Sequence, residues 1–391
     1  MRRLGFLIAL AIALPHRAHA ATCDTLPNPI YLQVGDTQLN LMKRLGRALR
    51  DNTAKPITLV FLTSGSCTNI AAIYTPVAIK AATALTYIPS VAEDPNWTVN
   101  SVATTCTLAA DTVPDIANSA LFNSACTSAA PPATVHLTQG PAQAYVLAVP
   151  TASSQTAITF EEAYFVFGFG AAGMISPWID EAQLFIRTVT KSTLLAWAAN
   201  ISVPADKWKG VRRDGSPMVV ADVNGGTAAA IGILGAEVYD ANRTTMKALA
   251  FRAKGQYAAY YPDSSSSSRD KKNIRDGHYT VWSPTIWMDS INATSGAPVK
   301  PDARYVIDLI AGKTVTPAPT FPMIDIIAAV GLVPDCAMGV NRSFEGGPLT
   351  LYQPAESCTC KYESLVDTSS CTTCTTTCAT GVCRNGFCEV R

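Results

Sequence analysis

The sequence predicts an α/β protein of two lobes, each a mixed sheet with helices on both faces, followed by a small disulfide-rich C-terminal tail. Near the start of the chain a strand, a polar turn and a helix follow one another twice, the pattern of an α/β sheet. The 391 residues exceed what one ordinary hydrophobic core organises, so we expect two lobes. Eight of the 12 cysteines lie between Cys336 and the end of the chain, which predicts the tail.

An export signal precedes the lobes. Residues 1–20 begin with two arginines, continue with an apolar run from Leu4 to Leu14, and end in the small-x-small pattern Ala18-His19-Ala20. The run is too short to span a bilayer and remain there. We therefore expect cleavage before Ala21 and a mature protein that is periplasmic or secreted, where disulfides form.

The mature chain carries little net charge. Loss of residues 1–20 removes three of the 30 basic residues and none of the 29 acidic ones, which leaves a net charge of about −2. This balance argues against nucleic-acid binding and against a membrane-surface role. No later segment reaches the roughly 18 unbroken apolar residues of a membrane helix, so we expect no stable membrane insertion after signal removal.

The first lobe opens with a strand over 29–34 that runs into Gly35-Asp36-Thr37 and then a helix. Leucines recur at helical spacing from Leu41 to Leu49, and Asp36 or Thr37 is the expected N-cap. A second strand over 57–62 stops at a polar turn, residues 64–69, before another helix.

A polar, proline-containing region over 85–140 holds two more cysteines. Cys106 and Cys126 are close enough in sequence to pair across a loop, and with Cys23 and Cys67 they form an even set that allows three connectivities. We favour the pairing of Cys106 with Cys126.

The second lobe begins with a strand over 144–149. The sequence Thr159-Phe160-Glu161-Glu162 is a capping box that starts a helix extending to about residue 167. A short strand over 184–187, a polar turn over 188–193 and a helix over 194–199 follow. Further strands are expected at 230–234 and 246–251, a turn and strand at 275–282, and helices at 302–310 and 323–330.

Two polar or glycine-rich runs invite functional interpretations that we reject. Gly168-Phe169-Gly170-Ala171-Ala172-Gly173 matches a dinucleotide fingerprint but follows a helix instead of a strand, so we expect a glycine-rich helix exit. Residues 264–272 are a run of serines followed by charged residues, and this composition predicts a solvated loop.

Only His136 and His278 remain after signal removal. Two histidines make a histidine-rich metal site or a histidine-based catalytic triad improbable. We expect no cofactor, no metal and no enzymatic activity, and a structural turn at His278.

Three polar turns share one position, between a strand and a helix: residues 35–37, 64–68 and 187–193. Such turns expose the backbone N–H groups of the following helix, and Ser and Thr add hydroxyl donors. Brought together, they would hold a small oxyanion, with Arg187 adding a charge-assisted contact. Ordinary helix capping is the alternative for each turn alone.

These turns, in this order, resemble those of the periplasmic phosphate-binding proteins that feed ABC importers, a branch of the type 2 solute-binding proteins. The similarity spans roughly 27–335. Residues 35–37 resemble the family's Gly-x-Thr loop, and residues 65–70 resemble its Gly-Ser-Ser-Gly-Gly-Val loop. Residues 115–120 resemble its Asp-x-Gly-x-Ser-Asp segment. Trp178 together with residues 187–193 resembles its Trp…Arg-x-x-x-Ser-Gly-Thr signature.

The resemblance implies a two-lobed type 2 periplasmic-binding-protein fold and a set of ligand contacts. The positions that it assigns to ligand binding are Thr37, Ser66, Arg187, Lys191, Ser192 and Thr193. The chain departs from the pattern at Ala120, where the family has the acidic residue that accepts the proton of hydrogen phosphate. It also has Lys191 where the family has serine. We expect replacement of Arg187 by Ala to abolish oxyanion binding with little effect on stability.

We predict an exported solute-binding protein that captures phosphate or a phosphate-like oxyanion between its lobes, for ABC-type import through a permease. The domains are expected at 21–335, with lobe 1 at about 21–135 plus 255–335 and lobe 2 at about 136–254, and at 336–391 for the tail. The alternative is a secreted structural or interaction protein with a degenerate cleft and a partner-binding tail.

The cysteines of the tail are better explained by disulfides than by zinc, because the protein is exported. The disulfide candidates are Cys106, Cys126, Cys336, Cys358, Cys360, Cys371, Cys374, Cys378, Cys383 and Cys388.

Overall fold

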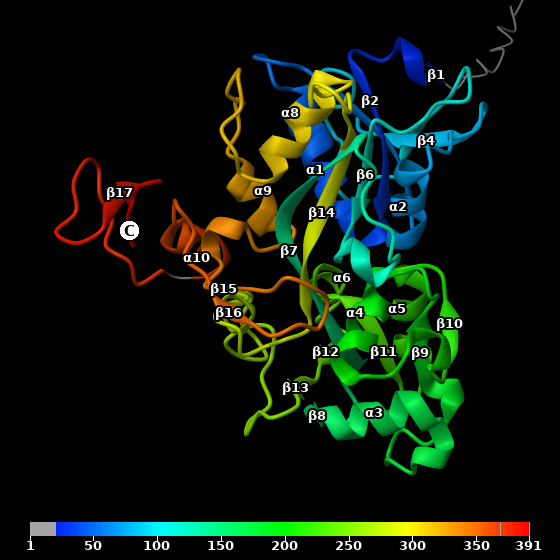
Figure 1. Ribbon diagram of the computed structural model, residues 1–391. Helices are drawn as coiled ribbons and strands as arrows, with labels where there is room; N and C mark the ends of the chain where they lie inside the picture. The colour runs from blue at the N-terminus through cyan, green and yellow to red at the C-terminus, as the bar shows by residue number, and fades with distance from the viewer. Residues whose placement is uncertain (1–20, 368, 391) are drawn as a thin grey trace, which may run out of the picture.

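A mixed 12-stranded sheet runs through the length of the molecule in the computed structural model (Figure 1). The structure describes residues 21–367 and 369–390, so the predicted signal at 1–20 lies outside the described residues. The strand order is β1-β5-β4-β3-β2-β6-β14-β7-β11-β9-β10, with β12 also paired to β7. Parallel pairs such as β2 with β3 and β9 with β10 alternate with antiparallel pairs around β7 and β14.

The strands of this sheet are β1 (Ala21–Thr22), β2 (Pro29–Gly35), β3 (Thr58–Ser64), β4 (Ala84–Tyr87), β5 (Thr104–Thr107), β6 (Ile116–Ser119), β7 (Val135–Pro150), β9 (Leu184–Arg187), β10 (Val211–Arg213), β11 (Ile231–Gly235), β12 (Met246–Ala248) and β14 (Trp282–Ser290). Three two-stranded sheets pair β8 (Ala157–Thr159) with β13 (Ala250–Arg252), β15 (Val340–Asn341) with β16 (Thr350–Leu351), and β17 (Val382–Arg384) with β18 (Phe387–Glu389).

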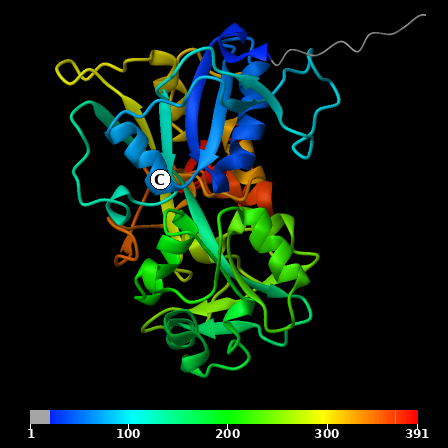
Figure 2. The same ribbon diagram turned by 90° about the vertical axis from the view of Figure 1, so that its right-hand side faces the viewer.

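The helices are α1 (Leu39–Arg50), α2 (Ser66–Tyr74), α3 (Phe160–Phe169), α4 (Ser192–Ile201), α5 (Ser216–Gly225), α6 (Ala236–Ala241), α7 (Lys272–Arg275), α8 (Pro301–Ile310), α9 (Met323–Ala329) and α10 (Thr359–Val366). Figures 1 and 2 show α1, α2, α8 and α9 around the upper half of the sheet and α3 to α6 around the lower half.

The long strand β7 connects the two halves. Its first part pairs with β14, and its second part pairs with β11 and β12. The strand that the sequence predicts at 144–149 is therefore only the end of a 16-residue strand. Polar residues and Gly140 in its first part hide its strand character from a hydrophobic pattern.

Each half of the sheet has its own buried core. In the first half, Leu32 of β2, Leu45 of α1 and Ile307 of α8 belong to one cluster of buried apolar side chains. In the second half, Val146 of β7 and Trp197 of α4 belong to another. The fold class predicted from the sequence is thus confirmed: a two-lobed mixed α/β structure.

Local signals predicted several elements well. The capping box of α3 is present, since the Glu162 N–H donates to Thr159 Oγ1 at 3.1 Å and the Thr159 N–H donates to Glu162 Oε2 at 2.8 Å. The glycine run after it forms a 3₁₀ turn at Gly170–Gly173, as expected for a helix exit. The cap predicted for α1 is wrong: Asp36–Gln38 form a 3₁₀ turn, and α1 begins at Leu39 with no side-chain cap bond.

The favoured pairing of Cys106 with Cys126 is wrong. Cys106 is bonded to Cys23, and Cys67 is bonded to Cys126. The reason is strand pairing: β1 lies parallel to β5 with Thr22 opposite Thr107, which brings Cys23 beside Cys106. Cysteine spacing along the chain does not reveal which strands pair, so it could not predict this disulfide.

The loop after β13 is less solvated than the sequence suggests. Lys271 is fully buried, and its ammonium lies 2.7 Å from Asp240 Oδ2 and 2.9 Å from Asp263 Oδ1. Asp270 is also buried and accepts the Ser264 N–H at 2.8 Å. The two carboxylates offset the desolvation of the lysine, a partnership that a local charge pattern does not reveal.

Every disulfide candidate in the tail is paired. The bonds are Cys336–Cys358, Cys360–Cys371, Cys374–Cys383 and Cys378–Cys388. Cys374, Cys378 and Cys388 lie close together, but all three are in disulfides and so offer no thiolate to a metal.

The first part of the tail packs on the body. Tyr362 of α10 is fully buried within the larger apolar cluster, and Arg275 Nη2 donates to Glu363 Oε1 at 2.7 Å. The final hairpin, β17 and β18, extends from it (Figure 1). Among residues 21–367 and 369–390, no helix is both long enough and apolar enough to cross a membrane.

Candidate functional site

Five helices begin directly after strands where the two lobes face each other. α1 follows β2, α2 follows β3, α4 follows β9, α5 follows β10 and α6 follows β11. The first N–H groups of a helix have no partner within the helix, and its N-terminus carries partial positive charge. The fold therefore directs backbone donors from both lobes toward one region.

Ser66 and Thr37 lie together on the first-lobe side. Both are buried, and the Ser66 hydroxyl accepts the N–H of Ala120 at 3.1 Å. A Cβ on Gly35 would lie 3.6 Å from Thr37 Oγ1 and 4.0 Å from Ser66 Oγ, so all three residues border one small space. These two predicted positions are brought together at the ends of β2 and β3.

The lobes touch at the start of α2. The Cys67 N–H donates to the carbonyl oxygen of Thr190 in the opposite lobe at 3.2 Å. A side chain on Gly65 would place its Cβ 2.7 Å from that same oxygen, so only glycine permits this approach. The structure is accordingly a closed arrangement of the two lobes.

The start of α4 supplies the second-lobe side. Ser192 and Thr193 are buried. In the neighbouring strand β7, the Tyr145 O–H donates to the carbonyl oxygen of Ala120. Burial raises the pKa of Tyr145 well above its usual value, so the phenol stays neutral. Ala120 thus connects Ser66 with Tyr145, through its N–H and its carbonyl oxygen.

The hydroxyl of Thr193 is buried without a hydrogen-bond partner among the described residues, as is that of Thr280 away from the predicted contact positions. Its side chain is 0% exposed, and Oγ1 has no hydrogen-bond partner within the described part of the chain. A buried hydroxyl without a partner costs free energy, so such a group in a folded protein calls for an explanation.

Lys191 is ion-paired within the second lobe. Its ammonium lies 3.3 Å from Asp214 Oδ1, and both residues belong to the second lobe. Lys191 is buried at the N-cap position of α4. Of the six predicted contact positions, it is the one whose charge is already paired on its own side.

Arg187 is also buried at the end of β9, and most of its donors are in use. Nε donates to the Arg213 carbonyl at 3.2 Å, and Nη1 donates to Ser216 Oγ at 2.6 Å. Nη2 donates to the Asp214 carbonyl and to Asp36 Oδ2, both at 2.6 Å. A guanidinium has five N–H groups, so one remains.

These contacts bear on two expectations about Arg187. The carboxylate of Asp36 from the first lobe already accepts a hydrogen bond from it. Because Arg187 is fully buried and ion-paired, we expect its removal to lower the stability, in contrast to the sequence-based expectation.

Sequence reasoning missed a polar network behind Thr37. Gln38 Nε2 donates to Gln143 Oε1 at 3.1 Å, and Gln143 Nε2 donates to Glu237 Oε2. Gln38 Oε1 and Glu237 Oε1 are buried without a partner among the described residues. Burial raises the pKa of Glu237 to about 8, so its carboxyl is largely neutral at pH 7. These residues lie on separate elements, and no local motif links them.

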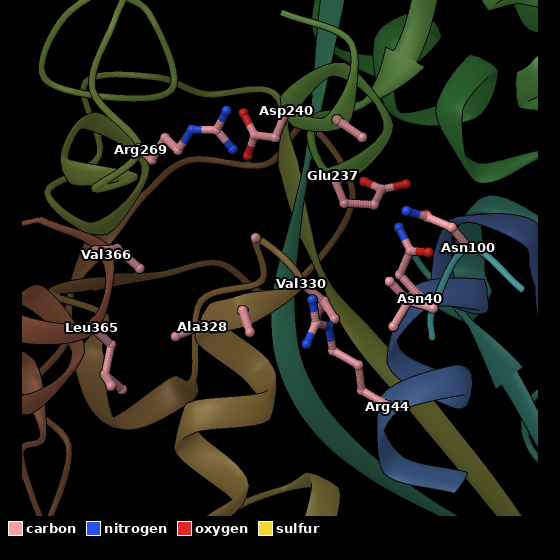
Figure 3. Close-up of a pocket in the computed structure, with 14 residues that line it drawn as sticks. Asn40, Arg44, Asn100, Glu237, Asp240, Arg269, Ala328, Val330, Leu365 and Val366 are labelled. Atoms are coloured by element: carbon pink, nitrogen blue, oxygen red, sulfur yellow. The ribbon is translucent and has the colours of Figure 1, made fainter. Parts of the chain in front are cut away.

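Glu237 borders two cavities. One of about 330 Å³ is bordered by Asp36, Thr37, Ser216 and Glu237. The other, of about 340 Å³, lies toward the tail (Figure 3). Figure 3 shows Glu237 and Asp240 of α6, Arg44 of α1, Arg269, and Leu365 and Val366 of α10 around it.

Comparison with known proteins supports the fold. No family model matches the sequence, and no curated protein matches it. Among solved structures, a phosphate ABC transporter substrate-binding protein from Clostridium perfringens, solved with bound phosphate, matches with a TM-score of 0.53 at 13% identity over 78% of this chain and 99% of that chain. An ABC-type phosphate transport receptor from Vibrio cholerae matches with a TM-score of 0.49 at 12% identity, over 78% of this chain and 100% of that one.

The chain therefore has the type 2 periplasmic-binding-protein fold of the Clostridium perfringens protein, with a disulfide-rich C-terminal tail added. The resemblance identified from the polar turns is confirmed at the level of the fold.

Proposed function

We propose that the protein binds a small oxyanion, phosphate or phosphate-like, between its lobes without making or breaking a covalent bond. The observation that carries this proposal is Thr193, whose hydroxyl is fully buried with no partner in the described chain, at the start of α4. An anion that accepts a hydrogen bond from the Thr193 hydroxyl would remove the free-energy cost of leaving this hydroxyl unpartnered. The anion would also gain a charge-assisted hydrogen bond.

The surroundings of Thr193 suit an anion. The N-termini of α2 and α4, nine and ten residues long, face the same region from opposite lobes. Both carry the partial positive charge of a helix N-terminus, although the Cys67 N–H of α2 already donates to the Thr190 carbonyl. Ser66 and Ser192 add hydroxyls, and Ala120 places no carboxylate against the ligand. Glu237 adds little negative charge at pH 7, since burial raises its pKa to about 8.

We further propose that the protein is exported and that it delivers its bound anion for import into the cell. The signal at 1–20 would deliver the protein to the periplasm or outside the cell, and the two-lobed fold is that of a protein solved with bound phosphate. An ABC permease is then the natural partner, with lobe closure presenting the loaded protein.

A second candidate function is a secreted interaction protein. It is favoured by one observation: Arg187, the strongest potential anion ligand, is already paired with Asp36. In that case the cleft would bind nothing, and the disulfide-linked hairpin at the end of the tail would contact a partner.

A thermal-shift screen of residues 21–391 against phosphate, arsenate, sulfate and molybdate separates the two candidates. A ligand at one hundred times its Kd stabilises the folded state by about 2.7 kcal/mol, which raises the melting temperature measurably. Ser66→Ala should reduce the shift, while Ser295→Ala in an exposed loop should not. No shift with any oxyanion, or an undiminished shift in Ser66→Ala, would contradict the proposal.

A further inference from the structure

Asp36 makes long-range contacts from the turn that precedes α1. It is the first residue of the 3₁₀ turn Asp36–Gln38, which lies between β2 and α1. Its carboxylate reaches residues more than 150 positions away in the sequence, in the other lobe.

The carboxylate of Asp36 is held as an anion in a receptor. Its Oδ2 accepts Arg187 Nη2 at 2.6 Å, the Ser216 hydroxyl at 3.2 Å and the Ser216 N–H at 3.3 Å. Ser216 begins α5, a helix of ten residues with no acidic residue in its first turn and no side-chain cap. A guanidinium, a hydroxyl and a helix N-terminus together form an anion site.

No other acid neutralises Arg187 within residues 21–367 and 369–390. Its remaining acceptors are the carbonyl oxygens of Arg213 and Asp214 and the hydroxyl of Ser216, all in the second lobe. Opening the lobes would separate Arg187 from Asp36, its one acidic partner among the described residues. The attraction between the two opposite charges is strong in a site with little water, so the pair favours the closed arrangement.

We infer that Asp36 is a built-in counter-anion: it fills the Arg187 site in place of a ligand and holds the two lobes closed when the cleft is empty. A second contact between the lobes, from the Cys67 N–H to the Thr190 carbonyl, involves no charge. The inference about closure does not depend on the proposed oxyanion function.

A consequence for binding does rest on the proposed function. An incoming anion either displaces Asp36 from Arg187 or binds beside it, using the donors of α2 and α4. In both cases the carboxylate of Asp36 opposes the ligand, by competition or by repulsion. Asp36 would thus set a weak affinity, suited to a ligand that is abundant or carries little charge.

Small-angle X-ray scattering of the ligand-free mature protein tests the closure. Asp36→Asn removes the charge with almost no change of shape, and Asp36→Ser removes the charge with a smaller polar side chain if the first variant folds poorly. Asp214→Asn is the control, because Asp214 pairs with Lys191 inside one lobe. We expect a larger radius of gyration in both Asp36 variants and the wild-type value in Asp214→Asn.

Equal radii of gyration for the wild type and the folded Asp36 variants would overturn the inference about closure. Calorimetric titration with phosphate tests the competition: Asp36→Asn should bind at least tenfold more tightly than the wild type. Equal or weaker binding would show that Asp36 belongs to the ligand's own contacts. If no variant binds any oxyanion, the proposed function fails while the scattering result still decides the closure.

Discussion

Replacement of Thr193 by valine separates a ligand-binding hydroxyl from a structural one. Thr193 is fully buried, and its Oγ1 has no partner in the described chain. Valine has nearly the same shape and a similar helix propensity, so the change creates no cavity. An unsatisfied buried hydroxyl costs about 1–3 kcal/mol, and part of this is recovered when the group is removed. We expect the ligand-free variant to be more stable by about 1 kcal/mol.

Ligand binding should change in the opposite direction. A hydrogen bond to a charged group contributes about 1.5–3 kcal/mol, which corresponds to roughly 10- to 150-fold in Kd. Urea denaturation without anion measures the first effect. Calorimetric titration with the tightest oxyanion of the screen measures the second. We expect the free energy of unfolding to rise and the affinity for the anion to fall. General damage to the fold would instead lower both.

A buried threonine with partners is the matched control. Thr285 Oγ1 donates to the Pro141 carbonyl at 2.9 Å and accepts Trp287 Nε1 at 3.0 Å. Thr285→Val leaves both groups unsatisfied, so we expect a loss of about 1–3 kcal/mol. If Thr193→Val loses as much stability as Thr285→Val and binds the anion normally, the Thr193 hydroxyl serves the fold, and our reasoning about the site is refuted.

Two further predictions concern buried charge. Arg187→Ala should lower the free energy of unfolding by about 3 kcal/mol in urea, because Asp36 loses the partner of a buried pair; an unchanged midpoint would contradict the ion pair. Glu237 has its pKa raised by burial from 4.5 to about 8, so the folded state retains a proton that the unfolded chain releases between these values. Stability should therefore fall as pH rises through that window, by at most about 1.4 kcal/mol per pH unit for this group. Glu237→Gln should flatten the slope measured by urea titrations at several pH values, and an identical slope in both proteins would exclude Glu237 as its source.

Local signals in the sequence predicted the elements that are fixed locally. The capping box at Thr159 and the strand over 184–187 depend on residues within a few positions of one another, and both occur as expected. The polar turns after β2, β3 and β9 also followed from local pattern. Their convergence came from the resemblance to a known fold.

Contacts between residues that are far apart in the sequence could not be predicted from local patterns. The pair of Asp36 with Arg187 spans 151 positions, and the burial of Lys271 depends on Asp240 and Asp263. The same limit explains the disulfides, since Cys23 meets Cys106 only because β1 pairs with β5. The site's charge balance is therefore a property of the tertiary structure.

A crystal structure of the mature protein with the tightest anion of the screen tests the central claim most directly. Our account predicts the anion between the lobes, within hydrogen-bond distance of Thr193 Oγ1 and the Ser66 hydroxyl, at the N-termini of α2 and α4. An anion bound elsewhere, for example in the cavity beside Arg44 and Arg269 (Figure 3), with the hydroxyl of Thr193 still unpartnered, would contradict it.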